Sequence, residues 1–133
     1  MTASAPSPYA KQARELQRQA VLTASPAALL VMLYDRLLAD LARAHDHLAA
    51  GRRAEAGEQL SHAQEIIGAL STSLRPELWD GAENLQAIYT YVSSTLLRAG
   101  STLDPALVAE CTECLEPLRD AWAEAAAAGH GRG

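Results

Sequence analysis

Residues 21–51 read VLTASPAALLVMLYDRLLADLARAHDHLAAG, and this stretch contains the start, the buried face and the end of one predicted helix. Ser25 suits the N-cap position, and Pro26 suits the first helical position, where its missing N–H is not needed. Apolar residues then recur at alternating intervals of three and four, as in a helix that packs against other helices. Gly51 is placed to end the helix. The apolar positions are Leu30, Leu33, Leu37, Leu41, Ala44 and Leu48.

Two stretches downstream repeat this pattern and predict two more helices. The first extends over about residues 53–74, and Pro76 forbids its continuation. The next opens at Asp80, with Glu83 three residues on as its partner in a capping box, and it ends near Gly100. The apolar faces consist of Ala56, Leu60, Ala63, Ile67, Leu70 and Leu74 on the first and Leu85, Ile88, Val92, Leu96 and Ala99 on the second.

A fourth helix begins with Asp104 as N-cap and Pro105 as first residue. Four helices of about 20 residues joined by short connections pack antiparallel to their neighbours, which predicts an all-α, up-down-up-down four-helix bundle. We expect a flexible N-terminal arm with a short helix over residues 1–22, the bundle over 23–128 and a disordered tail over 129–133. The apolar face of the fourth helix consists of Leu107, Cys111, Cys114, Leu118 and Trp122.

The composition narrows the classes of function. A chain of 133 residues fits one domain, and its richness in Ala and Leu without any Phe favours helix. A net charge of -5 argues against nucleic acid or an anionic membrane as the main partner, because both attract clustered Lys and Arg. No signal-peptide layout and no apolar run near the roughly 20 residues of a membrane span is found. We therefore expect a cytoplasmic protein without membrane insertion.

The first helix has more apolar surface than one buried face requires. Six apolar residues follow one another over residues 29–34, and at about 100° per residue they point all the way round the helix. Met32 lies opposite the predicted core face, and on the third helix Tyr91 lies off the buried stripe. Apolar strips on two long helices suit an amphipathic partner helix. The alternative is that they are ordinary core and cover residues of a monomer.

No pattern of catalytic or metal-binding residues emerges. Cys111 and Cys114 form a lone CxxC on one helix face, and we interpret them as buried thiols because further zinc ligands at suitable spacing are missing. Glu58 and His62 are one turn apart, which predicts a solvent-facing ion pair. A di-iron bundle would need paired Glu-x-x-His motifs, and a phosphotransfer histidine would need a basic residue close after His62. We expect no enzyme, no metal and no cofactor.

The turn sequence WDG at residues 79–81 resembles the W-x-G turn of small helical-hairpin proteins exported by mycobacterial-type secretion systems. Those proteins have two helices and a C-terminal Y-x-x-x-[DE] signal, whereas this chain predicts four helices and has Ser93 and Thr95 four residues after Tyr89 and Tyr91. A secreted helical protein of this kind, or a bundle that associates with itself through its apolar strips, is the alternative to a module that binds another protein.

Four segments of the chain resemble the FliS family of flagellar export chaperones, in the family's order and spacing. TASP at residues 23–26 and MLYD at 32–35 resemble the start of its first bundle helix. AQEII at 63–67 resembles its second helix, and LRDAW at 118–122 resembles the end of its fourth. The third helix carries Asn84-Leu85 and Tyr89-x-Tyr91, which resemble the family's third helix. Together the four segments identify the chain as similar to this family.

The resemblance covers about residues 16–122, with two departures. Leu16 stands where the family usually has a tyrosine, and the first tyrosine of this chain, Tyr9, lies further out. Arg36 stands where the family commonly has glycine after its Y-[DN] pair, and a helix tolerates this change.

The resemblance implies that the chain is a flagellin-binding export chaperone. Such a protein holds the C-terminal helical segment of flagellin unpolymerised in the cytoplasm and delivers it to the flagellar type III export apparatus. The implied partners are flagellin, a component of the flagellar export gate and other flagellar regulators. We expect a monomer or a weak homodimer.

A partner of this kind predicts which residues form the binding site. We expect Thr23, Ser25 and Pro26 to form a cap and hinge between the bundle and an arm that acts as a lid. Tyr34 and Tyr89 lie beside the core stripe, so packing in the core is an equal alternative for these two. The predicted partner-binding residues are Leu16, Val21, Leu29, Met32, Tyr34, Leu85, Ile88, Tyr89 and Tyr91.

Overall fold

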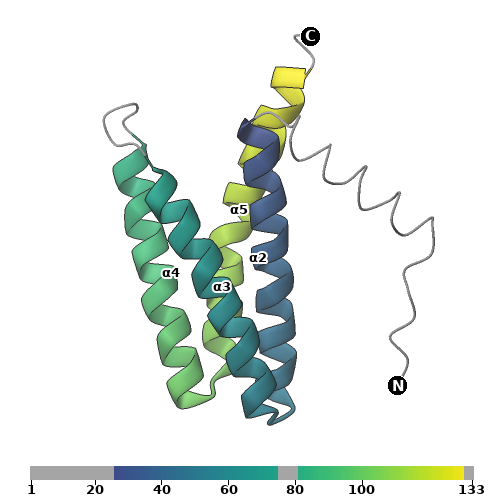
Figure 1. Ribbon diagram of the computed structural model, residues 1–133, viewed down its shortest axis with the longest axis vertical. Helices are drawn as coiled ribbons and strands as arrows, with labels where there is room; N and C mark the ends of the chain where they lie inside the picture. Colours follow the sequence, from purple (N-terminus) through teal and green to yellow (C-terminus); the bar gives the residue numbers. More distant parts are fainter. Residues whose placement is uncertain (1–25, 75–80, 131–133) are drawn as a thin grey trace, which may run out of the picture.

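The computed structural model describes residues 26–74 and 81–130, and every regular element in them is an α-helix, as the sequence predicts. The arm predicted over residues 1–22 lies outside the described residues, and the last helix extends two residues beyond the predicted end of the bundle at residue 128. The helices are α2 (Pro26–Ala49), α3 (Arg53–Ser73), α4 (Ala82–Thr102) and α5 (Pro105–His130), labelled as in Figure 1.

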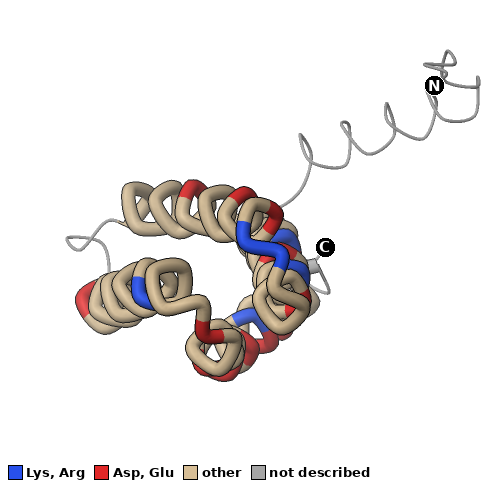
Figure 2. The backbone as a smooth tube through the Cα atoms, turned by 90° about the horizontal axis from the view of Figure 1, so that it is seen from below, with Lys and Arg blue, Asp and Glu red and all other residues tan. Residues whose placement is uncertain are grey.

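The four helices form the predicted antiparallel bundle. Each helix packs against the next one in the chain, and α5 closes the bundle by packing against α2 (Figure 1). Seen along their axes, the helices surround a common core and carry acidic and basic residues (Figure 2). The contacts of α2 with α3 and α5 are the most extensive, whereas α4 is held less closely and diverges from α5 toward one end of the bundle (Figure 1).

The end of α2 follows from its glycine. Gly51 adopts a φ of 76°, in the left-handed region that glycine enters without steric cost. Its N–H donates to the carbonyl of Leu48 at 3.1 Å, and the N–H of Arg52 donates to the carbonyl of His47 at 2.8 Å. This pair of bonds is a Schellman motif, which satisfies carbonyls at the helix end. The predicted role of Gly51 as the helix terminator is confirmed.

The predicted N-cap is found at the start of α5, whereas the start of α4 has no side-chain cap among the described residues. The N-cap position of α4 falls at Gly81, which has no side chain to cap the helix, and the predicted cap Asp80 lies outside the described residues. At α5, Oδ1 of Asp104 accepts a hydrogen bond from the N–H of Ala106 at 2.9 Å. Asp104 is therefore the N-cap that the sequence predicts, with Pro105 as the first helical residue.

The end of α4 differs from the prediction that Gly100 terminates it. The helix continues to Thr102, and the left-handed residue is Leu103, with φ 56° and ψ 42°. A left-handed leucine costs about 1–2 kcal/mol, which the packing of Leu103 against the core offsets. Gly100 instead lies inside the helix and faces α3, where a Cβ would lie 3.4 Å from Cδ1 of Leu60, an ordinary van der Waals contact.

Pro117 lies inside α5, and the helix continues through it to His130. A proline has no N–H, so the carbonyl of Glu113, four residues earlier, receives no helical hydrogen bond there. Both residues are exposed, which leaves this carbonyl on the side of α5 where water is available.

The core follows the predicted stripes in large part, with corrections on α2 and α5. Of the five residues assigned to the buried face of the fourth helix, Cys111 is fully buried, whereas Leu107, Cys114, Leu118 and Trp122 are half-buried. Leu33 was expected to be buried but is 38% exposed, and Tyr34 takes the inward position with no exposed surface. Tyr34 continues the spacing of Leu37 and Leu41, which places it on the same face as these two residues. The fully or nearly fully buried residues that the predicted stripes omit are Tyr34, Asp40, Ile66, Ala82, Tyr89, Thr95, Val108 and Leu115.

Candidate partner-binding groove

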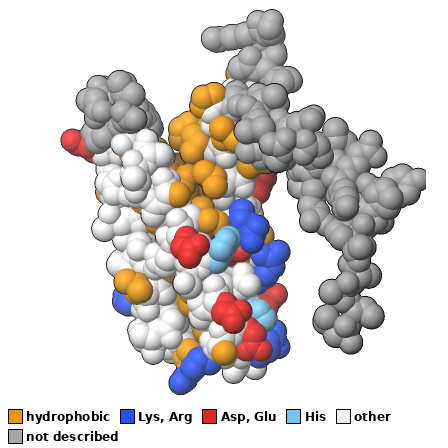
Figure 3. Space-filling model, viewed as in Figure 1, with side chains coloured by type: hydrophobic (Ala, Val, Ile, Leu, Met, Phe, Trp, Pro, Cys, Tyr) orange, Lys and Arg blue, Asp and Glu red, His pale blue; other side chains and the backbone are white. Residues whose placement is uncertain are grey.

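An apolar groove opens where α4 and α5 diverge, and hydrophobic side chains gather at this end of the bundle (Figure 3). Its volume is about 360 Å³. Among the residues that the structure describes, Asn84 contributes the one polar side chain to the lining, and no charged side chain takes part. This α4–α5 groove is lined by Gly81, Asn84, Leu85, Ile88, Leu118, Ala121, Trp122 and Ala125.

Both walls of the α4–α5 groove have the same helical spacing. The α4 wall consists of positions 81, 84, 85 and 88, and the α5 wall of positions 118, 121, 122 and 125. Residues separated by three, four and seven share one face of a helix, so each wall presents two turns, or about 11 Å of helix. A helical segment of a partner can lie between two such walls and bury one apolar face.

The other grooves of the bundle are more polar. A groove of about 620 Å³ lies between α2 and α5, where Glu113, Glu116 and Asp120 contribute carboxylates to its lining. A groove of about 330 Å³ between α3 and α4 is lined largely by hydroxyl and amide side chains, and Leu97 at its edge is 67% exposed. Of these three sites, the α4–α5 groove is the one suited to an apolar helix face.

Two buried tyrosines meet in the core of the bundle. The hydroxyl of Tyr34 on α2 lies 2.6 Å from the hydroxyl of Tyr89 on α4, and both side chains are buried. Burial raises the pKa of Tyr34, while smaller hydrogen-bond effects of Tyr89 and Trp122 lower it. Burial, followed by the hydrogen bond with Tyr34, raises the pKa of Tyr89 far above its ordinary value. Both phenols are therefore neutral donors and acceptors in the physiological range.

Tyr91 lies near the α4–α5 groove, one turn along α4 from Ile88. Its ring is 44% exposed, and its hydroxyl donates to Oε1 of Glu110 on α5 at 3.0 Å. The hydrogen bond with Glu110 is the main cause that raises the pKa of Tyr91. The bond links α4 to α5.

The predicted apolar surface of α2 is present but lies on a different helix from the groove walls. Met32 is 39% exposed, in agreement with its predicted position opposite the core, and Leu29 is half-buried. Leu33 beside them is exposed as well, which the sequence analysis did not predict. None of these residues lines the α4–α5 groove.

The structure brings together only part of the predicted binding set. Leu85 and Ile88 line the groove, whereas Tyr34 and Tyr89 occupy the core, which was the stated alternative for these two. Tyr89 also contributes to the lining of the α3–α4 groove. Pro26 is exposed at the start of α2. The predicted residues outside the described part of the chain are Leu16, Val21, Thr23 and Ser25.

The α5 wall was missed by sequence reasoning. Leu118 and Trp122 were assigned to the buried face of the fourth helix, and they are in fact half-buried and packed against the core with one side. Ala121 and Ala125 extend the same spacing to the exposed edge of that face. The sequence did contain a signal for this wall. The apolar face of the fourth helix is wider than the surface that one neighbouring helix can cover.

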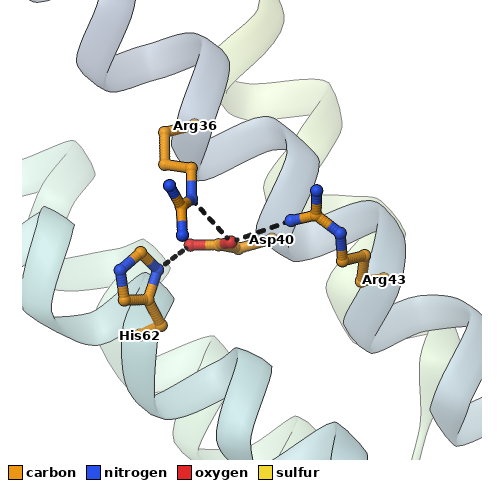
Figure 4. A network of polar contacts seen from close by, with 4 residues as sticks. All are labelled: Arg36, Asp40, Arg43 and His62. Carbon is orange, nitrogen blue, oxygen red and sulfur yellow. Dashed lines mark hydrogen bonds and ion pairs between the residues drawn. The ribbon is translucent and has the colours of Figure 1, made fainter. Parts of the chain in front are cut away.

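A second polar cluster joins α2 to α3 away from the groove (Figure 4). Asp40 on α2 is 1% exposed, and its Oδ2 accepts a hydrogen bond from Nδ1 of His62 on α3. Its Oδ1 is 3.4 Å from Nε of Arg36 and 3.3 Å from Nη1 of Arg43. His62 therefore pairs with Asp40 across two helices, and the predicted pairing with Glu58 on its own helix is wrong.

The described cysteines and histidines form no metal-binding group, and both cysteines are free thiols. Cys111 is fully buried, and burial is the main cause that raises its pKa to about 12, whereas Cys114 is half-buried. No group of three or more potential metal ligands occurs among residues 26–74 and 81–130. None of the four helices has the length and apolarity required to cross a membrane.

The fold and the α4–α5 groove together define an all-α bundle with an apolar surface site of helix-binding dimensions. The family described as "Flagellar protein FliS" matches residues 9–129, and the chain belongs to this family. The predicted resemblance is thereby confirmed.

Three relatives carry the description "Flagellar secretion chaperone FliS". The protein of Escherichia coli (strain K12) is 36% identical over 107 residues, which cover 79% of each chain. The protein of Salmonella typhimurium (strain LT2) is 35% identical over 123 residues, or 91% of this chain and 89% of the relative. The protein of Bacillus subtilis (strain 168) is 29% identical over 109 residues, or 82% of this chain and 81% of the relative.

Proposed function

We propose that this protein is a cytoplasmic export chaperone that binds the C-terminal helical segment of flagellin and delivers it unpolymerised to the flagellar type III export apparatus. Membership of the FliS family and the names of the three relatives support the flagellar role. The α4–α5 groove is the observation that carries the binding claim, because its apolar, uncharged walls suit a helix that would otherwise pack on other flagellin helices.

The protein would keep flagellin unpolymerised by binding the same apolar face through which flagellin segments associate with one another. A flagellin segment that lies in the groove buries the residues through which it would associate with other copies. Release requires only that the export machinery bind or unfold the segment more favourably, so the groove needs neither ATP nor a cofactor. A component of the export gate and other flagellar regulators are the remaining partners of this proposal.

The predicted binding residues outside the groove extend the proposal to a longer client. Met32 on α2 and Tyr91 on α4 are exposed side chains of large apolar area, as expected for contacts with a segment that wraps around the bundle. Leu16 and Val21 belong to the proposed lid, and Thr23 and Ser25 to its hinge. For these four residues the support is the sequence alone.

The test is isothermal titration calorimetry of the full chain with a peptide that covers the C-terminal helical segment of flagellin. Ala121 is exposed and lines the groove, so Ala121→Asp places a carboxylate in the site without disturbing the core. We expect affinity to fall roughly tenfold or more, because the charge would be desolvated without a partner.

The matched control is Ala127→Asp, which adds the same charge to an exposed position of α5 that does not line the groove. This variant should bind the peptide like the unmodified protein, and circular dichroism should report a folded bundle for both variants. Equal affinity of the two variants would place the binding site elsewhere. Absence of saturable heat with the unmodified protein would refute flagellin binding itself.

Light scattering separates this function from the alternative of a self-associating bundle. The chaperone should convert from a monomer to a 1:1 complex when the flagellin peptide is added. A stable dimer that ignores the peptide would favour the alternative.

A further inference from the structure

Arg119 joins the end of α5 that carries the groove wall to α2. Its Nε donates to Oδ1 of Asp35 at 2.7 Å, and its Nη2 donates to Oδ2 of the same carboxylate at 3.4 Å. One guanidinium group therefore engages both oxygens, which constrains the direction of the contact as well as its length. Among the ion pairs of the described residues, this is the one that connects α2 with α5.

This end of α5 has few apolar anchors in the core. Over residues 118–128, every side chain is half-buried or exposed. The two large apolar ones, Leu118 and Trp122, pack against the core and also line the α4–α5 groove. Apolar burial therefore holds this end less firmly than the first half of the helix, and a polar contact contributes a larger share. The fully buried side chains of α5 are Val108, Cys111 and Leu115.

The ion pair and the groove wall lie on different sides of α5. Arg119 directly follows the wall residue Leu118, and successive residues of a helix point about 100° apart. Arg119 reaches α2, whereas the wall at positions 118, 121, 122 and 125 faces α4. In Figure 1, α4 and α2 lie on either side of this end of α5. The ion pair thus ties α5 to α2 without occupying any part of the groove.

The geometry points to Arg119 as a positioning residue of the α4–α5 groove: paired with Asp35, it holds the end of α5 at α2 and so keeps the two groove walls apart in the free protein. Without the pair, this end samples positions closer to α4, and a smaller fraction of molecules presents an open groove. A partner helix then binds with lower apparent affinity. The consequence for the partner rests on the proposed function, whereas the position of α5 is a property of the free protein.

Asp120 provides a matched control for Asp35. Its Oδ1 lies 3.6 Å from Nη1 of Arg119, but the two residues are neighbours on α5, so this contact cannot set the position of α5 relative to α2. The side chains of Arg119 and Asp35 are 34% and 52% exposed, so water and salt weaken their attraction. The expected effect of losing the pair is therefore a few-fold change.

The test compares Asp35→Asn with Asp120→Asn in the full chain by hydrogen–deuterium exchange and mass spectrometry. Each variant removes one carboxylate charge beside Arg119, and only the first removes the contact between helices. In Asp35→Asn we expect amide exchange over residues 118–128 to rise about threefold, with unchanged exchange in the first half of α5. Asp120→Asn should exchange like the unmodified protein. The difference between the two variants should shrink at about 1 M salt, which screens exposed pairs.

Variants of Arg119 test whether the two side chains act through one contact. Arg119→Lys keeps the charge but loses the fork of donors, so its exchange should rise less than that of Arg119→Gln. The double variant Asp35→Asn with Arg119→Gln should exchange like either single variant, because one contact can be lost only once.

Binding of the flagellin peptide should follow the exchange data. The dissociation constant should rise about threefold in Asp35→Asn and stay unchanged in Asp120→Asn. Unchanged exchange in Asp35→Asn, or a uniform rise over all four helices, would overturn the positioning role of Arg119, and so would additive effects of the two single changes. The exchange measurement needs no partner, so its outcome is separate from that of the proposed function, which fails if the unmodified protein does not bind the peptide.

Discussion

Asp40 is a charged residue that is buried in the bundle and joins two of its helices. Its carboxylate is 1% exposed on α2, while the side chains of Arg36 and Arg43 beside it are 61% and 55% exposed. These two long contacts come from its own helix and leave solvent around the guanidinium groups. The contact with His62 comes from α3 and is the part of the cluster that joins two helices.

This asymmetry predicts unequal effects of removing the partners of Asp40. His62→Ala leaves the buried carboxylate without its closest donor, and we expect a loss of about 1–3 kcal/mol in the free energy of unfolding. Arg36→Ala removes an exposed pair one turn apart and should cost at most about 1 kcal/mol. Urea unfolding at neutral pH measures both. Equal losses would mean that the contact between helices contributes no more than the pair within one helix.

Cys111 makes stability depend on alkaline pH. Its pKa is raised in the folded protein from 9.0 to about 12, mainly because the thiol is buried. Below the lower value the thiol is protonated in both states and has no effect. Between the two values the unfolded chain releases the proton while the folded chain keeps it, so stability falls by up to about 1.4 kcal/mol per pH unit.

The measurement is urea unfolding of the unmodified chain and of Cys111→Ala at several pH values between about pH 8 and 10. The tyrosines, with an ordinary pKa of about 10, are present in both proteins, so the difference between the two pH profiles reports Cys111. The alanine variant should be less stable at the lower end, because it leaves space in the core, and its stability should then change less with pH. Parallel pH profiles would contradict the assignment to Cys111.

Among the elements, α3 is stabilised more by packing against neighbouring helices than by the helix propensity of its own residues. It contains Gly57 and Gly68, and a Cβ added at either position would meet no atom within 4 Å. Glycine inside a helix is less favourable than alanine by about 1 kcal/mol. Packing of its buried face against α2 and α4 therefore stabilises the helix despite its weak helix propensity.

Gly57→Ala should raise the free energy of unfolding by roughly 0.5–1 kcal/mol, because helix propensity improves and no clash arises. Gly51→Ala is the opposite case, since its φ of 76° disfavours any side chain, and it should destabilise by about 1 kcal/mol. Thermal unfolding followed by circular dichroism compares the two. A stabilising Gly51→Ala would contradict the terminator role of Gly51.

For the whole molecule, periodicity and caps suffice to predict four antiparallel helices. The spacing of Leu37, Leu41 and Ala44 and the caps at Gly51 and Asp104 depend on local chemistry, and each is found where the sequence places it. The site was predicted only in part. Leu85 and Ile88 fall in the groove because they lie on the predicted apolar face of the third helix.

The distance between neighbouring helices could not be predicted from the sequence. Whether Trp122 is buried or lines a groove depends on how far α5 lies from α4, and this distance is not encoded in the pattern of either helix. The same holds for Tyr34, which displaces Leu33 from the inward face although both are apolar. His62 found its partner 22 residues earlier in the chain, beyond the reach of any rule of helical spacing.

Pro117 has a mechanical consequence for the α4–α5 groove. Every α5 residue of the groove wall lies after it, at positions 118 to 125, while the N-cap at Asp104 and the buried residues Val108, Cys111 and Leu115 lie before it. Since the backbone ladder is interrupted at this proline, the distal half of α5 is joined to the proximal half by fewer bonds. Under the proposed function, α5 would bend at Pro117 to widen the groove for a helix, while the residues before Pro117 keep their packing in the core.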